Sequence, residues 1–136
     1  MSHTCSAAFV RCMDFRLTPA VEDFFRTHEL SEDADVISLA GAAKGLADGK
    51  GSFLESQIDL SKRLHEIKKV ILVNHTDCGA YGGHAAFASS EEEQVKHVSD
   101  LHTAKEQIQS SHPELEVELW LAYIEENGNV HIEEVA

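Results

Sequence analysis

The stretch from Val70 to Gly83 constrains the fold of this chain most strongly, because it joins a buried strand to reactive side chains. Four apolar and mostly β-branched residues open it at 70–73, and they predict a buried strand. His75 and Cys78 follow this run three positions apart, and a glycine-rich turn comes directly after them. In α/β proteins, ligands bind where parallel strands end. The stretch therefore predicts a site at the carboxyl edge of a parallel sheet.

Strands and helices alternate along the rest of the chain. Apolar runs predict strands over residues 7–10, 34–40, 70–73, 115–124 and 129–135. Helical spacing of apolar residues predicts helices over 18–28, 53–67 and 90–111, a short helix after the glycine-rich turn through Ala88, and a loop over 46–52. This order indicates one α/β domain over residues 1–136, a three-layer α/β/α fold with a central, mainly parallel sheet of about five strands. The last strand is expected to be antiparallel, because a tight turn at 126–129 precedes it.

Two of the predicted helices begin with capping signals. Thr18 is expected to be the N-cap of the first helix, with Pro19 at the first helical position. Ser90 and Glu93 have the spacing of a capping box, which predicts Ser90 as the N-cap of the long helix. The expected buried stripe of that helix consists of Val95, Val98, Leu101, Ala104 and Ile108.

The charge and composition of the chain exclude several classes of partner. A formal net charge of −13 argues against nucleic acid or an anionic membrane surface, since both would repel the protein. No apolar run approaches the ~20 residues that span a bilayer. The segment from Met1 to Ala8 lacks the basic and apolar regions of a secretory signal. We therefore expect a cytoplasmic protein whose thiols stay reduced.

Cys12 stands two residues after the first predicted strand, as His75 stands two residues and Cys78 five residues after the third. The chain has three cysteines, an odd number, which favours metal binding or catalysis over a disulfide framework. If the two strands are neighbours, the three side chains converge on one point. Two thiolates and one imidazole suit zinc, and three protein ligands leave the fourth tetrahedral position open. Because thiolates favour zinc over magnesium or calcium, we predict one Zn²⁺ per chain at this point.

Asp14 and Arg16 lie two and four residues after Cys12, within reach of the same point. In one hypothesis, Asp14 accepts a hydrogen bond from a zinc-bound water and orients it, while Arg16 keeps the carboxylate ionised through a bidentate pair. In the other, Asp14 takes the fourth zinc position itself and closes the site until Arg16 draws it away. Both make zinc-bound hydroxide the nucleophile, because zinc lowers the pKa of water from about 16 to about 7.

These motifs together resemble the signature of a known family. The segments Cys12-Met-Asp-Phe-Arg16 and His75-Thr-Asp-Cys78 are similar to the Cys-x-Asp-x-Arg and His-x-x-Cys motifs of the β-class carbonic anhydrases. The similarity continues at Ala40–Gly41 and in the ending from Leu119 to Val130, so it spans nearly the whole chain.

The resemblance implies an activity and a set of roles. Carried over position by position, Cys12, His75 and Cys78 would be the zinc ligands, and Asp14 and Arg16 the catalytic pair. The activity would be that of a carbonate dehydratase, the reversible hydration of carbon dioxide to bicarbonate. The resemblance also implies a homodimer or a higher homo-oligomer, because active sites of this family are completed at a subunit interface.

The chain departs from the family pattern in three places. Leu39 stands where asparagine is usual, and Asn74 stands where glycine commonly precedes the ligand histidine. Eleven residues precede Cys12, so we expect the N-terminal helices that clasp a partner subunit in the family to be absent. These departures leave a non-catalytic zinc-binding homologue as an alternative function. A hydrolase of carbonyl sulfide or carbon disulfide is a second alternative, because these molecules are linear and similarly electrophilic and could react at the same site.

The remaining polar residues near the motifs are expected to have minor roles. Cys5 is expected to be a bystander near the chain start, and Lys44 and Tyr81 are expected to be exposed on loops rather than to hold an anion. His84 is a weaker candidate, for proton transfer. Mostly surface positions are expected for the other histidines, which are His3, His28, His65, His97, His102, His112 and His131.

Overall fold

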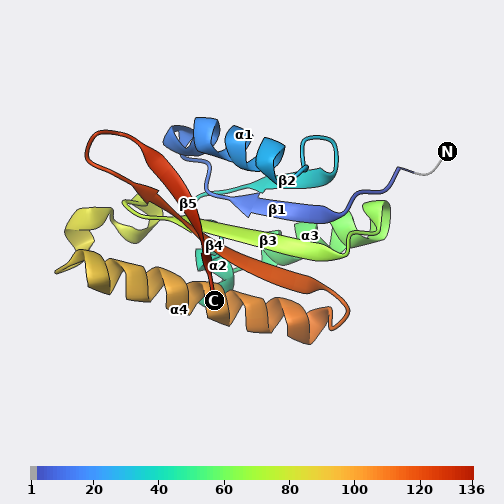
Figure 1. Ribbon diagram of the computed structural model, residues 1–136. Helices are drawn as coiled ribbons and strands as arrows, with labels where there is room; N and C mark the ends of the chain where they lie inside the picture. The colour runs from blue at the N-terminus through green and yellow to red at the C-terminus, as the bar shows by residue number, and fades with distance from the viewer. Residues whose placement is uncertain (1–2) are drawn as a thin grey trace.

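A five-stranded sheet forms the middle of the structure, a computed structural model that describes residues 3–136. The strands are β1 (Ala7–Arg11), β2 (Ala34–Ser38), β3 (Lys69–His75), β4 (Glu116–Ile124) and β5 (Val130–Val135). They lie side by side in the order β2-β1-β3-β4-β5 (Figure 1). Neighbouring strands from β2 to β4 run parallel, and β5 runs antiparallel to β4. The predicted sheet is therefore confirmed, including its antiparallel last strand.

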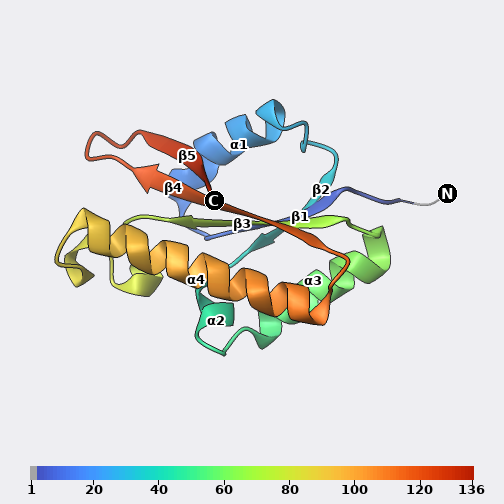
Figure 2. The same cartoon turned by 60° about the horizontal axis from the view of Figure 1, so that its bottom comes forward.

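Helices cover both faces of the sheet and complete the three predicted layers. One face carries α1 (Thr18–Thr27), and the other carries α2 (Lys44–Ala47), α3 (Ser52–His65) and α4 (Ser90–Ser111) (Figures 1 and 2). Short 3-10 helices add η1 (Phe15–Leu17), η2 (Gly79–Tyr81) and η3 (His84–Ala86). Within residues 3–136, every helix is too short or too polar to cross a membrane.

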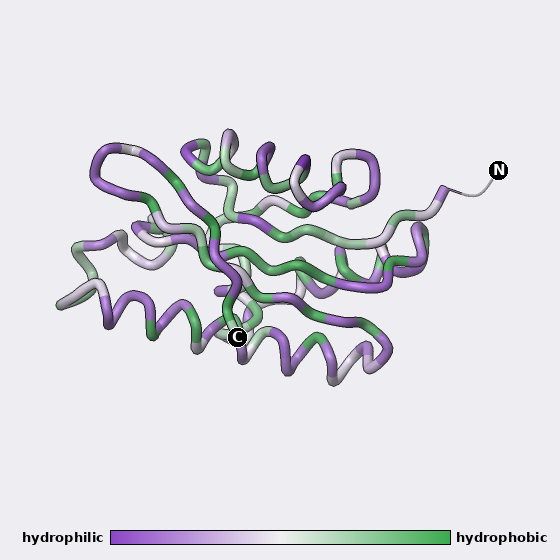
Figure 3. The backbone as a smooth tube through the Cα atoms, in the orientation of Figure 1, coloured by the Kyte–Doolittle hydropathy of each residue, from purple (hydrophilic) through white to green (hydrophobic). Residues whose placement is uncertain are grey.

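Side chains of the central strands point alternately into two cores, one on each face. Phe9 and Ile71 belong to the core on the α1 side, whereas Val10 and Leu72 belong to the core under α3 and α4. A strand that is buried on both faces has no polar face to alternate with. This explains the hydrophobic runs along β1 and β3 (Figure 3).

The parallel pairing of β1 with β3 confirms that the first and third predicted strands are neighbours. Arg11, the last residue of β1, pairs with Val73, two residues before β3 ends at His75. The segments that follow the two strands therefore leave the sheet at the same edge, and Cys12 comes close to the end of β3.

The first helix begins one residue earlier than its capping signal predicts. Asp14 caps η1, because its side chain accepts a hydrogen bond from the Arg16 N–H, and η1 continues directly into α1. The N-cap of α1 is thus Leu17, and the prediction of Thr18 was wrong. The Thr18 hydroxyl instead accepts a hydrogen bond from Arg11 at 3.5 Å.

Two loop regions differ from the prediction. The segment 46–52, predicted as a loop, begins inside α2, and Leu46 of that helical turn is buried. The glycine-rich segment forms η2 and η3 rather than one short helix. Gly82 and Gly83 separate them, because their φ angles of 89° and 77° lie in the left-handed region that glycine adopts easily.

The N-cap of α4 is Ser89, so the prediction of Ser90 was wrong by one position. The Ser89 side chain accepts a hydrogen bond from the Glu92 N–H at 3.1 Å. The Glu92 carboxylate in turn accepts one from the Ala88 N–H at 3.3 Å. The observed pair Ser89–Glu92 and the predicted pair Ser90–Glu93 have the same spacing in the sequence, and only the backbone geometry distinguishes them. Ser89 is extended, with φ −155° and ψ 164°, as an N-cap residue must be.

We expect Ser89→Ala to lower the free energy of unfolding by about 1 kcal/mol, because it removes the N-cap acceptor. Ser90→Ala is the matched control and should change it by less than about 0.5 kcal/mol, since Ser90 lies inside the helix, where alanine is well tolerated. Urea denaturation followed by circular dichroism measures both. Equal losses in the two variants would contradict the assignment of the cap.

Candidate metal centre

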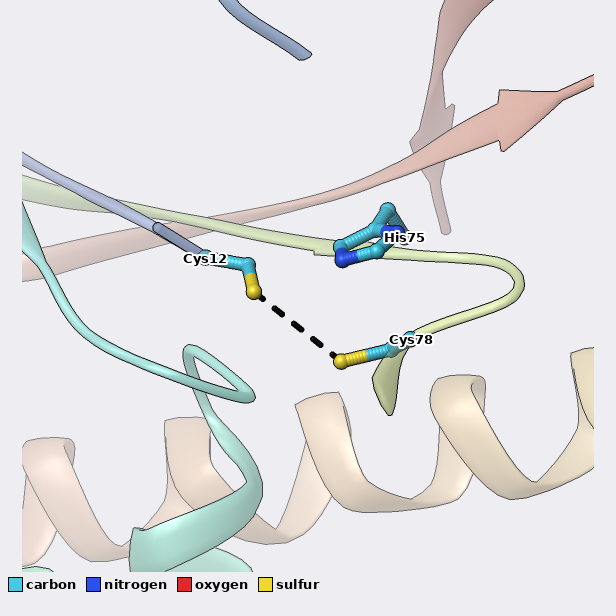
Figure 4. Close-up of side chains that lie close together, drawn as sticks. All are labelled: Cys12, His75 and Cys78. Carbon is cyan, nitrogen blue, oxygen red and sulfur yellow. Dashed lines mark hydrogen bonds between the residues drawn. The ribbon is translucent and has the colours of Figure 1, made fainter. Parts of the chain in front are cut away.

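The structure brings Cys12, His75 and Cys78 together at the carboxyl edge of the sheet (Figure 4). One ligand atom of each residue lies within 4.8 Å of the other two, and the two Sγ atoms are 4.0 Å apart. Cys12 directly follows β1, His75 ends β3, and Cys78 directly precedes η2. All three are buried, with exposed fractions of 5%, 1% and 1%. We call these three residues the Cys₂His cluster.

The orientation of His75 fits the binding of a metal ion. Its Nδ1 donates a hydrogen bond to the carbonyl oxygen of Thr76 at 2.7 Å, which leaves Nε2 with a free lone pair. This Nε2 is buried and has no hydrogen-bond partner among residues 3–136. Metal-binding histidines commonly hold their second ring N–H on a carbonyl in this way. The unpaired nitrogen and the two sulfur atoms thus form a donor set that could hold a metal ion.

The two thiols of the cluster lie within hydrogen-bond distance of each other. A hydrogen bond from the Cys78 thiol lowers the pKa of Cys12, burial opposes this effect, and a hydrogen bond from the Gly41 N–H lowers the pKa further. The Gly41 nitrogen lies 3.5 Å from the Cys12 sulfur. The same bond to Cys12 raises the pKa of Cys78, with burial as the second cause. A cation bound by both sulfur atoms would displace the protons that they carry.

Asp14 and Arg16 form a bidentate ion pair beside the cluster. Arg16 Nη2 donates to Asp14 Oδ2 at 2.7 Å, and Arg16 Nε lies 3.1 Å from Oδ1. These hydrogen bonds lower the pKa of Asp14 to about 2, so its carboxylate is ionised at neutral pH. Asp14 Oδ2 also lies 3.8 Å from His75 Nε2. The carboxylate is therefore within reach of a ligand held at the cluster.

Asp77 joins the two halves of the site. Arg16 donates to its side chain through Nη1 and to its carbonyl oxygen through Nη2, both at 3.0 Å. The Asp77 carboxylate also accepts the His84 N–H at 2.8 Å, and this bond, followed by those from Arg16, lowers the pKa of Asp77. Asp77 has a positive φ of 54°, a conformation that aspartate tolerates better than most residues. The turn between His75 and Cys78 is thus fixed to the segment that carries Asp14.

Arg11 stabilises the turn between Cys12 and Asp14. Its guanidinium donates to the carbonyl oxygen of Cys12 at 2.7 Å and to that of Asp14 at 2.8 Å. The residue is only 9% exposed. Sequence reasoning missed this role, because an arginine at the end of a predicted strand is usually solvated.

The exposure of the side chains increases from the cluster outward. The His75 side chain is 0% exposed, that of Asp14 is 15% exposed, and that of Arg16 is 35% exposed. Asp14 and Arg16 therefore lie on the solvent side of the Cys₂His cluster. All five residues singled out from the sequence share one site, and their roles as ligands and catalytic pair stay predictions.

The buried face of α4 differs from the predicted stripe, because it carries polar residues. Glu93, His97 and Asp100 are at most 5% exposed, whereas Val95 of the predicted stripe is 67% exposed. The prediction that His97 lies on the surface was wrong: it is fully buried, and burial lowers its pKa to about 4. The spacing of these three residues, i, i+4 and i+7, places them on one helical face, but a solvated polar face has the same spacing, so the sequence carried no signal of their burial.

A buried hydrogen-bond network connects α4 to the residue that precedes His75. Asn74 Nδ2 lies 3.1 Å from both Tyr81 Oη and His97 Nδ1, and Asn74 Oδ1 accepts the Ala43 N–H at 3.1 Å. The Tyr81 hydroxyl donates to Asp100 at 2.7 Å. Burial and this bond raise the pKa of Tyr81. The network ties the end of β3 to two helices and so fixes the backbone beside His75.

The other residues considered from the sequence lie outside the cluster. Tyr81 is half-buried in the network rather than exposed, and Lys44 pairs with Asp48 at 2.5 Å on α2. His84 pairs with the buried Glu93, and its side chain is 53% exposed. Glu93 also accepts the Asp77 N–H at 2.7 Å, which adds a third anchor to the turn before Cys78.

We expect Tyr81→Phe to lower the free energy of unfolding by about 1–3 kcal/mol, because Asp100 and Asn74 each lose a buried partner. Tyr123→Phe is the matched control: this half-buried tyrosine of β4 stacks on His131, and its substitution should change stability by less than 1 kcal/mol or so. Urea denaturation of both variants measures the difference. An equally small loss in both would show that the network contributes little.

Comparison with known proteins places the chain in a family. Residues 2–135 match the family described as "Putative carbonic anhydrase". The chain therefore belongs to this carbonic anhydrase family.

Solved structures agree on the particular fold. The chain is similar to β-carbonic anhydrase isoform I (TvaCA1) from the protozoan Trichomonas vaginalis, with a TM-score of 0.66 and 15% identity over 96% of this chain and 83% of that one. It is also similar to the β-carbonic anhydrase CcaA, with a TM-score of 0.51 and 19% identity over 99% of this chain and 85% of that one. A chain from the crystal structures of two tetrameric β-carbonic anhydrases of the ascomycete Sordaria macrospora is similar as well. Its TM-score is 0.50, with 11% identity over 99% of this chain and 84% of that one. These likenesses show a β-carbonic anhydrase fold.

Two Rickettsia proteins are similar in sequence. The chain is 30% identical over 123 residues to "Uncharacterized protein RC0076" of Rickettsia conorii, covering 85% of this chain and 66% of that protein. It is 32% identical over 123 residues to an "Uncharacterized protein" of Rickettsia bellii, and the match covers 85% of this chain and 75% of that protein. The chain thus spans just under two thirds of the length of the first relative.

Proposed function

We propose that this protein is a zinc-dependent carbonic anhydrase that reversibly hydrates carbon dioxide to bicarbonate. The observation that supports this most directly is the buried Cys₂His cluster with its unpaired His75 Nε2, 3.8 Å from the Asp14 carboxylate. Membership in the carbonic anhydrase family and the β-carbonic anhydrase fold agree with the proposal.

The donor set favours zinc. Two sulfur atoms and one imidazole nitrogen suit a borderline-soft cation, and a set of three leaves one tetrahedral position for a water molecule. Bound zinc would supply an acidified water that attacks the carbon of carbon dioxide at neutral pH. In the overall reaction one carbon–oxygen bond forms, and one proton passes to the buffer.

The roles of Asp14 and Arg16 follow from their geometry. Asp14 is ionised and can accept a hydrogen bond from the attacking water through Oδ2, which fixes the direction of its lone pair. Arg16 prevents the protonation and the rotation of that carboxylate by binding both of its oxygens. Because the Asp14–Arg16 pair is intact, we favour the hypothesis in which Asp14 orients water over the one in which it occupies the fourth metal position.

Stopped-flow measurement of carbon dioxide hydration tests the proposal. The zinc-loaded protein should hydrate carbon dioxide faster than buffer alone at neutral and alkaline pH. Asp14→Asn should keep its zinc and lose activity on the order of 100-fold or more, because it removes the acceptor that orients the water. Asp23→Asn is the matched control, an exposed carboxylate of α1 that pairs with Arg26, and it should keep full activity.

Substitution of a ligand separates metal binding from turnover. Cys12→Ser should lose activity and bind one zinc fewer than the unsubstituted protein, measured by elemental analysis. Zinc retained in full by this variant would refute the ligand assignment. A zinc-loaded protein with no rate above buffer would instead favour a non-catalytic zinc-binding homologue.

We also propose a cytoplasmic, single-domain protein that forms homodimers or higher homo-oligomers. Two large apolar side chains beside the site support the assembly: Met13 is 65% exposed and Phe15 is 83% exposed. Burial of such side chains in a subunit contact is favourable. The tetrameric β-carbonic anhydrases with a similar fold agree with this proposal.

Light scattering measures the assembly. We expect the protein to be at least dimeric at micromolar concentration, and Phe15→Glu to shift it toward the monomer, because a charge cannot be buried in an apolar contact without a partner. Val95→Glu, at a 67% exposed position of α4, should leave the mass unchanged. A monomeric unsubstituted protein would contradict the proposal.

A further inference from the structure

A second group of metal-ligating side chains lies at the opposite end of the sheet from the Cys₂His cluster. Cys5 precedes β1, Asp35 lies near the start of β2, and His65 is the last residue of α3. One ligand atom of each lies within 4.8 Å of the other two. The segment that precedes β1 and the end of α3 lie at this end of the molecule (Figure 1).

Backbone hydrogen bonds hold these three residues in place. The Cys5 N–H donates to the carbonyl oxygen of His65 at 3.0 Å, and the Ser6 N–H donates to that of Asp33 at 3.1 Å. The parallel register of β1 and β2 then sets Ala8 opposite Asp35. The group is therefore built by the main chain and does not depend on side-chain attraction alone.

The His65 and Asp35 side chains already have an arrangement found in metal sites. His65 Nδ1 lies 2.7 Å and 2.9 Å from the two carboxylate oxygens of Asp35. The Ser61 hydroxyl donates to the same carboxylate at 2.5 Å and fixes its orientation. A cation at this point would displace the Nδ1 proton, so that Nδ1 and the Asp35 carboxylate could both bind it. The thiol of Cys5 makes only a weak contact, to the Ala7 carbonyl oxygen at 3.6 Å.

A pocket of about 340 Å³ opens over this group. Its lining adds two further donors, His3 and Glu32, and contains neither lysine nor arginine. The ring of His3 lies edge-on to the ring of His65, with 5.1 Å between their centroids. The pocket is thus rich in donors for a cation and lacks a basic side chain that would compete with one.

We propose that Cys5, Asp35 and His65, with His3 as a further donor, form a second zinc site. Thiolate, imidazole and carboxylate together suit zinc or a similar borderline-soft divalent cation better than magnesium or calcium. The site lies outside the carbonic anhydrase chemistry, because it occupies the amino-terminal edge of the sheet.

A cation bound there would have a structural role. Its ligands come from the segment before β1, from β2 and from the end of α3, so it would link three parts of the chain that are far apart in sequence. Binding to the folded state alone would stabilise that state by mass action. We expect saturating zinc to raise the Tm of the protein, and Cys5→Ser to reduce that rise.

Cobalt(II) titration isolates the second site. The variant Cys12→Ser/Cys78→Ser keeps Cys5 as the only thiol of the chain. It should bind one cobalt with a thiolate-to-cobalt charge-transfer band, and Cys5→Ser in this background should abolish the band. His65→Ala and Asp35→Asn should weaken binding by about 100-fold or more, since even indirect partners of a metal change its affinity 10–100-fold. Thr4→Ala, which changes a pocket residue that is a poor ligand, should bind cobalt normally.

Absence of the charge-transfer band in the folded double variant would overturn the proposal. If circular dichroism shows that the double variant does not fold, zinc counts after equilibrium dialysis at micromolar free zinc decide the question. Cys5→Ser alone should then bind one zinc fewer than the unsubstituted protein, whatever the total, and His102→Ala should match the unsubstituted protein. Equal counts in the Cys5→Ser and unsubstituted proteins would overturn the proposal without touching the Cys₂His cluster.

Discussion

The parallel pairing of β1 with β3 is the constraint on which the metal centre depends. Its register sets Arg11 opposite Val73 and so fixes how far Cys12 lies from the end of β3. A slip of one residue would turn the side chains of β1 to the wrong faces. A slip of two would move Cys12 by roughly 6.6 Å at about 3.3 Å per residue, more than the 4.8 Å within which the ligand atoms now lie. The two cores that alternate along both strands prevent such slips.

The sheet and the cluster could be predicted because their determinants are local. Unbroken apolar runs marked β1 and β3, and the first candidate ligand stands two residues after each run. Parallel strands need crossover connections, so the alternation of strands and helices fixed the class of fold. From these facts alone, Cys12, His75 and Cys78 had to come close once the two strands were neighbours. The antiparallel ending followed from a short turn.

The features that could not be predicted depend on residues that are far from their partners in the sequence. His97 is buried because Asn74 and Tyr81 pack against it, and neither residue is near it in the chain. The burial of a polar residue is favourable only with such a partner, and helical spacing does not show whether a partner exists. Helical spacing therefore predicted only an apolar stripe. Ser89 and Ser90 are both followed by glutamate at the right distance, and only the backbone path selects the cap. The hydrogen bonds of Arg11 and Asp77 that hold the two turns of the site likewise depend on turn geometry that no motif encodes.

The position of His75 at the end of the central strand has a kinetic consequence. β3 is hydrogen-bonded to strands on both sides, so it belongs to the part of the molecule that opens last. A metal ion held by His75 could leave only when that segment opens, and its release would therefore be slow even where its equilibrium affinity is modest. Asp35 lies by contrast on the edge strand β2, which is paired with a strand on one side only, so local opening is easier there. An ion there would exchange with the surroundings quickly, so the two ends of one sheet would differ in how long they retain a cation.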